Sequence, residues 1–100
     1  TTPRRSSALP DVPTIAEAGY PGFNMSTWYG VWAPAGTPAA VVQRLSSEIA
    51  AIVLLPEVRS QFEKLGAEPV GNTPAEFTGF AKAELVKWAG IVKQSGAKVD

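Results

Sequence analysis

Residues 28–38, WYGVWAPAGTP, constrain the fold of this 100-residue chain more than any other segment. The aromatic and β-branched residues at its start are typical of a strand. Pro34 and Gly36 then predict a turn. Thr37 can cap a helix, and Pro38 fits the first helical position, where no backbone N–H is needed. The segment therefore predicts a strand, a turn and a helix start in immediate succession.

The predicted strand covers residues 23–33, and its side chains alternate between two faces. Trp28 and Trp32 belong to one face, whereas Tyr29 and Val31 belong to the other, together with Phe23, Met25 and Thr27. Because both faces carry large apolar groups, we expect the strand to be buried on both sides over part of its length. A second, short strand is predicted at 67–70, with Pro69 weakening it.

Three helices are predicted, over residues 38–54, from Pro56 to about residue 65, and over residues 74–95. Pro56 ends the first and begins the second. Thr73 and Glu76 predict a capping box for the third, and Gly66 and Gly96 are natural stops. The expected apolar stripe of the first helix is Val41, Leu45, Ile49 and Ile52. That of the third is Phe77, Ala81, Leu85, Trp88 and Val92.

Residues 1–24 are rich in proline, serine and glycine. Thr14 and Glu17 have the spacing of a capping box, which predicts a short helical stretch over residues 14–18. Gly19 would end it, and Tyr20 begins a turn.

The composition excludes several chemistries. The chain has no cysteine and no histidine, so it offers no thiol, no disulfide, no imidazole base and no common zinc site. Formal net charge is zero, and nothing indicates nucleic-acid binding. The carboxylates, including Glu84, are interpreted as capping or surface groups. We therefore expect a protein that is not an enzyme and uses no cofactor and no metal.

The best candidates for a ligand-binding surface are Ser26, Thr27, Trp28 and Tyr29, because hydroxyls beside aromatic rings at a strand end are typical of small-ligand pockets. Alternatively, Trp28 and Tyr29 pack in the core or at a hinge. Asp11, between two prolines, either stabilises a turn through its own backbone or contacts a ligand.

Five stretches, taken in order, carry a family resemblance: residues 9–19 (LPDVPTIAEAG), 28–38, 56–59 (PEVR), 65–71 (LGAEPVG) and 73–77 (TPAEF). Together they closely resemble the C-terminal third of the substrate-binding receptors of tripartite tricarboxylate transporters, the Bug family. The family usually has an aspartate before the proline at position 56, where this chain has Leu55. The second helix is thus expected to fray, or Leu55 to fill a pocket.

The resemblance implies an α/β chain that is part of a two-lobed periplasmic-binding-protein type II fold. It would be a C-terminal fragment with three helices and a small sheet. Residues 1–22 would be the end of the second lobe and the return loop. Residues 23–100 would be the C-terminal part of the first lobe, including a hinge-crossing strand.

The function implied by the resemblance is that of a periplasmic receptor segment. It helps to capture a small carboxylate or related metabolite and to deliver it to membrane transporter subunits, while most ligand contacts come from loops outside this chain. The alternative is a stand-alone interaction module without a ligand. Because the stripe of the first helix would lack its partners, we also hypothesise that the fragment self-associates.

Overall fold

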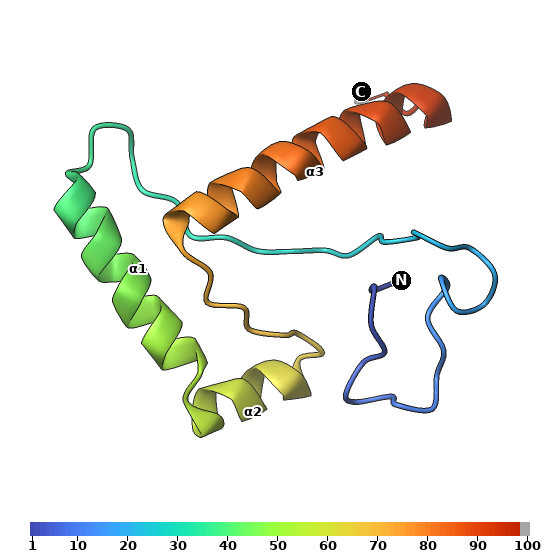
Figure 1. Ribbon diagram of the computed structural model, residues 1–100, viewed down its shortest axis with the longest axis horizontal. Coiled ribbons are helices and arrows are strands. Elements are labelled where there is room, and N and C mark those ends of the chain that lie inside the picture. Colours follow the sequence, from blue (N-terminus) through green and yellow to red (C-terminus); the bar gives the residue numbers. More distant parts are fainter. Residues whose placement is uncertain (99–100) are drawn as a thin grey trace.

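Three helices make up the regular structure of the computed structural model, which describes residues 1–98 (Figure 1). They are α1 (Ala39–Val53), α2 (Pro56–Lys64) and α3 (Pro74–Ser95). All three predicted helices are confirmed to within one residue at each end. Within the described part of the chain, no single helix has the length and apolarity to cross a bilayer; α1 and α2 meet that test only as a pair, bent by 76°.

The predicted capping box of α3 is confirmed. The Thr73 hydroxyl accepts from the Glu76 backbone N–H at 3.3 Å, and the Thr73 N–H donates to Glu76 Oε2 at 2.8 Å. Gly96 ends the helix with φ of 69°, a left-handed conformation that glycine adopts without a steric penalty. Both ends of α3 are therefore specified by local sequence.

The start of α1 differs from the prediction. Pro38 occupies the N-cap position, and α1 has no side-chain cap. The Thr37 hydroxyl instead donates to the Pro34 carbonyl at 2.8 Å, and the Thr37 N–H donates to the same oxygen at 3.2 Å. The prediction that Thr37 caps α1 is therefore wrong, because this threonine closes the preceding turn.

Leu55 is the N-cap residue of α2 and makes no side-chain hydrogen bond, because its side chain is a hydrocarbon. Leu55 is exposed, so it does not fill a pocket among residues 1–98.

Neither predicted strand is present in residues 1–98, where three helices accompany irregular segments. Residues 23–33 form an extended segment (hereafter the extended segment) that lies beside α3 in Figure 1. A strand needs a neighbouring strand to complete its hydrogen-bond ladder, and a helix uses its backbone groups internally. The expected small sheet, and with it the α/β class, is thus not seen in the described residues.

The extended segment runs antiparallel to α3. Near its start, the Lys87 ammonium donates to the Asn24 carbonyl at 3.3 Å, whereas near its end the Trp32 ring packs 4.8 Å from the Phe77 ring. The start of the segment therefore lies beside the C-terminal half of α3, and its end lies beside the N-terminal end of α3. This pairing explains why aromatic side chains from both elements meet.

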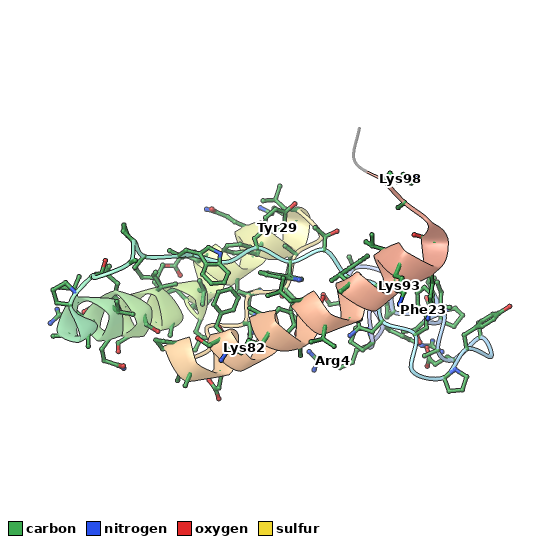
Figure 2. All side chains as sticks on the ribbon, turned by 90° about the horizontal axis from the view of Figure 1, so that it is seen from above. Arg4, Phe23, Tyr29, Lys82, Lys93 and Lys98 are labelled. Atoms are coloured by element: carbon green, nitrogen blue, oxygen red, sulfur yellow. The ribbon has the colours of Figure 1, made fainter. Side chains whose placement is uncertain are left out.

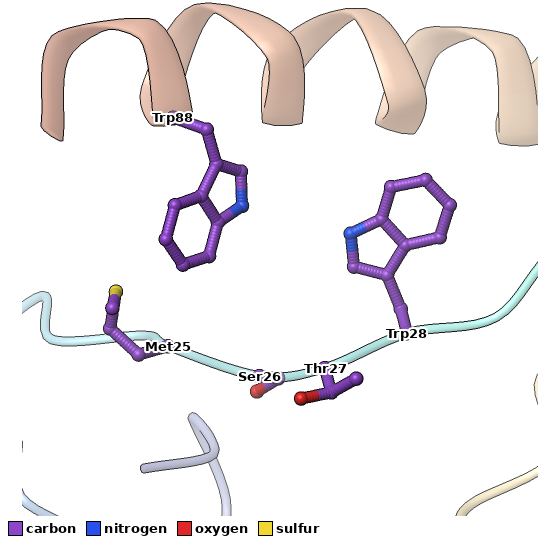
Figure 3. Close-up of a pocket in the computed structure, with 5 residues that line it drawn as sticks. All are labelled: Met25, Ser26, Thr27, Trp28 and Trp88. Carbon is purple, nitrogen blue, oxygen red and sulfur yellow. The ribbon is translucent and has the colours of Figure 1, made fainter. Parts of the chain in front are cut away.

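The predicted alternation of the extended segment holds for residues 27–29 but not for Met25, whose side chain lies on the α3 side (Figure 3), and burial on both sides is wrong. Trp28 and Trp32 both pack against Phe77, at 5.8 and 4.8 Å between ring centroids. Tyr29 and Val31 are 90% and 75% exposed. In Figure 2, Tyr29 stands on the side of the segment that faces away from α3. Trp28 and Trp32 thus pack against α3, whereas Tyr29 and Val31 are open to solvent.

The packed face of α1 is displaced from the predicted stripe. Val41, Leu45 and Ile52 are exposed. The less exposed residues of α1 are Val42, Ser46, Ile49, Ala50 and Val53. Helix α1 contacts both α2 and α3, and on its less exposed face Ala50 and Val53 lie close to Gly71.

The inner face of α3 departs from prediction at two positions, because Glu84 replaces Leu85 and Ile91 replaces the exposed Val92. Leu85, expected in the core, is 72% exposed, whereas Glu84 is only 9% exposed. The inward residues of α3 are Phe77, Ala81, Glu84, Trp88 and Ile91. These follow steps of four, three, four and three, so a carboxylate occupies a core position of the helical repeat.

The described chain has little interior. Ala81 is the one buried apolar residue among residues 1–98. The accessible surface is 8212 Å², against roughly 5,400 Å² for a folded monomer of this mass. The radius of gyration is 16.4 Å, against about 13 Å for a compact 100-residue domain. Much apolar surface is therefore left without a covering partner.

Residues 1–22 form successive turns, and the predicted helical stretch over residues 14–18 is present as a single turn. The Thr14–Glu17 capping box is confirmed, because Thr14 N–H donates to Glu17 Oε2 at 2.7 Å and Glu17 N–H donates to Thr14 Oγ1 at 3.1 Å. It supports one α-turn, closed by the Ala18 N–H on the Thr14 carbonyl. The turn before Phe23 is also confirmed, with Phe23 N–H donating to the Tyr20 carbonyl.

Candidate functional site

The Glu84 carboxylate is the centre of a polar cluster that joins α3 to the extended segment. Its Oε2 accepts from the indole N–H of Trp88 at 2.9 Å and from that of Trp28 at 3.3 Å. Its Oε1 lies 2.5 Å from the Lys87 ammonium. We call these four residues, Trp28, Glu84, Lys87 and Trp88, the Glu84 cluster.

The partners of Glu84 explain how a carboxylate can occupy a core position. An ionised carboxylate can only accept hydrogen bonds, and an indole N–H can only donate one. Burying such a charge is costly unless charged or polar groups are paired with it. The ammonium of Lys87 above all, then the two indoles of Trp88 and Trp28, lower the pKa of Glu84 below its ordinary value of 4.5, against the opposing effect of burial.

Helix geometry brings three members of the cluster together. Glu84, Lys87 and Trp88 lie three and four residues apart on α3, where neighbouring turns place side chains on one face. The Lys87 ammonium also lies 5.6 Å from the centroid of the Trp88 ring, a cation–π distance. Trp28 comes from the extended segment, so its indole joins two elements that are far apart in the sequence.

Aromatic packing supports the Trp28 indole from the N-terminal half of α3. Its ring meets those of Phe77 and Phe80 edge to face, with centroids 5.8 and 5.2 Å apart. Such geometry is the favoured one for aromatic pairs. The indole is therefore held by packing on one side and by the Glu84 carboxylate on the other.

An open cavity of about 380 Å³ lies between the extended segment and α3. Its lining residues are Met25, Ser26, Thr27, Trp28 and Trp88 (Figure 3). In this view the two indoles stand in the space between segment and helix, whereas the Ser26 and Thr27 hydroxyls lie on the side away from α3. A smaller cavity of about 180 Å³ adjoins Glu84, Lys87 and Trp28.

The structure brings three of the five predicted site residues together. Ser26, Thr27 and Trp28 line the larger cavity, with Ser26 donating to Asn24 Oδ1 at 3.0 Å. Tyr29 does not line it and is almost fully exposed. Of the two roles left open for Trp28, packing is seen, because its ring meets those of Phe77 and Phe80, and it also lines the cavity, whereas ligand binding stays a prediction.

Asp11 lies apart from these residues, in the exposed turns of the N-terminal segment. Its carboxylate makes no hydrogen bond or ion pair to the described residues, so the turn-stabilising role is not seen there. Nearby, Arg5 donates to Glu17 Oε2 at 3.0 Å and to the Pro10 carbonyl at 3.1 Å. Arg4 pairs with Glu68 at 2.6 Å.

Sequence reasoning missed Glu84, which it placed among the capping or surface carboxylates. A signal was present, because Glu84 fits the three- and four-residue steps that join Ala81 to Trp88. Because Leu85 is apolar, it was assigned to the core in place of Glu84. Within residues 1–98, no group of three or more acidic, histidine or cysteine side chains could hold a metal ion.

Comparison with known proteins identifies the family. Residues 1–97 match the family model described as "Tripartite tricarboxylate transporter family receptor". Protein BugT of Bordetella pertussis is 41% identical over 95% of this chain. A protein encoded in the tcbD–tcbE intergenic region of a Pseudomonas strain is 43% identical over 88% of the chain.

These matches cover a minor part of each relative. The aligned residues amount to 26% of the Pseudomonas protein and 29% of BugT. A third relative, from Agrobacterium vitis, is 37% identical over 96% of this chain and 29% of its own length. The chain thus corresponds to a fragment of such a protein.

The matched family has the periplasmic-binding-protein fold and consists of transporter receptors, which bind solutes and are not enzymes. Its model extends over both the N-terminal turns and all three helices. This chain belongs to the family of tripartite tricarboxylate transporter receptors.

Proposed function

We propose that the complete protein containing this chain is a periplasmic receptor that captures a small carboxylate or related metabolite for a tripartite tricarboxylate-type transporter. The observation that carries the proposal is the match of residues 1–97 to the receptor family. Receptors of this family are typically periplasmic, which supports the proposed location. The solute would be delivered to membrane subunits of the transporter.

The proposed division of the chain follows the resemblance. Residues 1–22 form the end of the second lobe and the return loop, and residues 23–100 belong to the first lobe, beginning with the hinge crossing. Support comes from the change in structure near residue 23, where successive turns give way to the extended segment and the helices. Residues 99 and 100 lie outside the described residues.

The proposed contribution to solute binding comes from Ser26, Thr27, Trp28 and Tyr29, with Asp11 as a more distant candidate. The Ser26 and Thr27 hydroxyls lie on the side of the extended segment away from α3, and the Tyr29 ring is exposed. Hydroxyl groups of this kind donate hydrogen bonds to carboxylate oxygens. Trp28, held on α3, would anchor the segment.

Isothermal titration calorimetry of the complete receptor with citrate, glutamate and aspartate tests the proposal. We expect at least one of these carboxylates to bind. Tyr29→Phe and Thr27→Val should weaken its binding about fivefold to tenfold, the value of one hydrogen bond. Tyr20→Phe, which alters an exposed tyrosine in the N-terminal turns, is the matched control and should bind like the parent.

If all variants bind the solute like the parent, the protein is a receptor whose binding site does not include Thr27 and Tyr29. No binding of any of the three acids would contradict the proposed class of solute. The large exposed apolar surface favours one alternative, a stand-alone interaction module. A reading frame with an export signal and a Gly-rich first loop supports the receptor, whereas one that begins near Thr1 supports the module.

A further inference from the structure

Two polar contacts tie the extended segment to α3. Lys87 donates to the Asn24 carbonyl at 3.3 Å, and Trp28 donates to Glu84 Oε2 at 3.3 Å. Asn24 and Trp28 lie four residues apart on the segment, and Glu84 and Lys87 lie three residues apart on α3. Together they fix the stretch between them, which contains Ser26 and Thr27.

The contact through Glu84 is the better shielded of the two. Glu84 is almost completely buried, whereas the Asn24 side of the other contact is exposed. Trp88 also donates to Oε2, and Lys87 pairs with Oε1, so these two contacts help to orient the carboxylate toward Trp28. The bond from Trp28 is therefore charge-assisted and partly shielded from water, and both of these features strengthen a polar contact.

Trp28 transmits this contact to its neighbours. In an extended chain, alternate side chains point to opposite sides. The Trp28 indole points to α3, so the adjacent side chains of Thr27 and Tyr29 are directed away from the helix, as Figures 2 and 3 show. Fixing one indole therefore fixes the direction of two candidate ligand-binding side chains.

We propose that Glu84 is a positioning residue of the receptor: by accepting from the Trp28 indole, it holds residues 26–29 in the arrangement that meets the solute. It touches no solute itself and acts through Trp28. The link to the solute rests on the proposed function, whereas the tie between Glu84 and Trp28 does not.

Three variants of the complete receptor separate positioning from general stability. Glu84→Leu keeps a similar volume but removes every acceptor. Trp28→Phe removes the indole N–H and keeps an aromatic ring against Phe77 and Phe80. Glu48→Gln is the control, because Glu48 is an exposed carboxylate of α1 paired with Arg44.

Two readouts report the tie directly. The first is the ¹H–¹⁵N signal of each indole, assigned by replacing Trp28, Trp32 and Trp88 one at a time. The second is hydrogen exchange of the backbone amides of residues 25–29, which reports local opening.

We expect Glu84→Leu to shift the indole signals of Trp28 and Trp88 and to leave that of Trp32 in place. Amide exchange at residues 25–29 should become about tenfold faster in Glu84→Leu and in Trp28→Phe, with no change in Glu48→Gln. If Glu84→Leu does not fold, Trp28→Phe decides alone, because it must speed exchange while the Trp88 signal persists.

An unshifted Trp28 signal in folded Glu84→Leu overturns the proposal, as does unchanged exchange at residues 25–29 in Trp28→Phe. If citrate, glutamate and aspartate all fail to bind the parent, the proposed function fails, and the indole and amide readouts still decide whether Glu84 positions the segment. If a probe binds the parent, Glu84→Leu should weaken it about tenfold. Equal binding despite faster exchange contradicts the link to the solute.

Discussion

The Phe77 ring lies directly against the backbone of Gly30. A Cβ atom at residue 30 would lie 3.0 and 3.1 Å from Phe77 Cε1 and Cε2, and closer still to Cζ. Phe77 cannot easily move aside, because the rings of Trp28 and Trp32 pack against it. The missing side chain of Gly30 is therefore what allows the extended segment to approach α3.

Gly30→Ala should destabilise the protein by about 1–3 kcal/mol, the usual cost of overpacking. Equilibrium urea denaturation measures the change. Gly79→Ala is the matched control, because a Cβ on this α3 residue meets no atom within 4 Å. The control should stabilise the protein by up to about 1 kcal/mol, since alanine favours a helix over glycine. Equal effects of the two substitutions would contradict the close approach at Gly30.

Thr73→Ala should destabilise the protein by about 1 kcal/mol, because it removes the cap of α3. Thr73→Ser should retain most of the stability, since serine caps equally well. Urea denaturation midpoints give the difference. Thr78 provides the control: its hydroxyl donates to the Pro74 carbonyl within the helix at 2.7 Å, a contact that competes with helical geometry. Thr78→Ala should therefore be close to neutral, and a loss equal to that of Thr73→Ala would argue against the capping role.

Acid should weaken the fold through Glu84. Hydrogen bonds from Lys87, Trp88 and Trp28 lower its pKa in the folded state below 4.5. The unfolded chain then binds the proton more readily, so this stabilisation is fully present above pH 4.5 and is lost as the pH falls through the lower, folded pKa. Glu17, held by Arg5 and the Thr14 N–H, has a lowered pKa and contributes with the same sign.

The measurement is the free energy of unfolding at a series of pH values from neutral to acid. Glu84→Gln should flatten the acid side of that curve, because the neutral amide does not titrate. An acid side as steep as that of the parent would show that Glu84 does not contribute. The indole signals of Trp28 and Trp88 should titrate together in the parent protein.

The 100-residue chain, produced alone, is expected to self-associate, because Val41, Leu45 and Ile52 form an exposed apolar stripe on α1. Sedimentation velocity should show species larger than the monomer. Leu45→Lys should shift the distribution toward the monomer by placing a charge in the stripe. Ser47→Lys, on a different face of the same helix, is the control and should sediment like the parent. A compact monomer at all concentrations would contradict the expectation.

Local signals in the sequence were sufficient for the helices. The Thr73–Glu76 capping box, Pro56 and Gly96 act within a few residues of themselves, so their effect can be read without knowledge of the rest of the fold. The helix bounds were therefore predicted to within a residue. The predicted cap at Thr37 was wrong because the Thr37 hydroxyl donates to the Pro34 carbonyl, a local contact that competes with capping the helix.

Pairing between distant segments could not be read in the same way. Residues 23–33 have the composition of a strand and are extended, but a sheet depends on neighbours that composition does not supply. Ser26, Thr27 and Trp28 line one cavity because they are contiguous, and their role in binding stays a prediction. Glu84 was missed because hydrophobicity, rather than the position of its partners, was used to choose between it and Leu85.

The shared acceptor at Glu84 has a consequence for how related receptors differ from one another. Trp28 and Trp88 donate to the same oxygen, so replacing either indole changes the surroundings of the other. Positions 28, 84 and 88 should thus be inherited as a set. In an alignment of receptors they are expected to change together, with acceptor-free residues at 84 wherever both indoles are replaced, although 28 and 84 are separated by more than half of this chain.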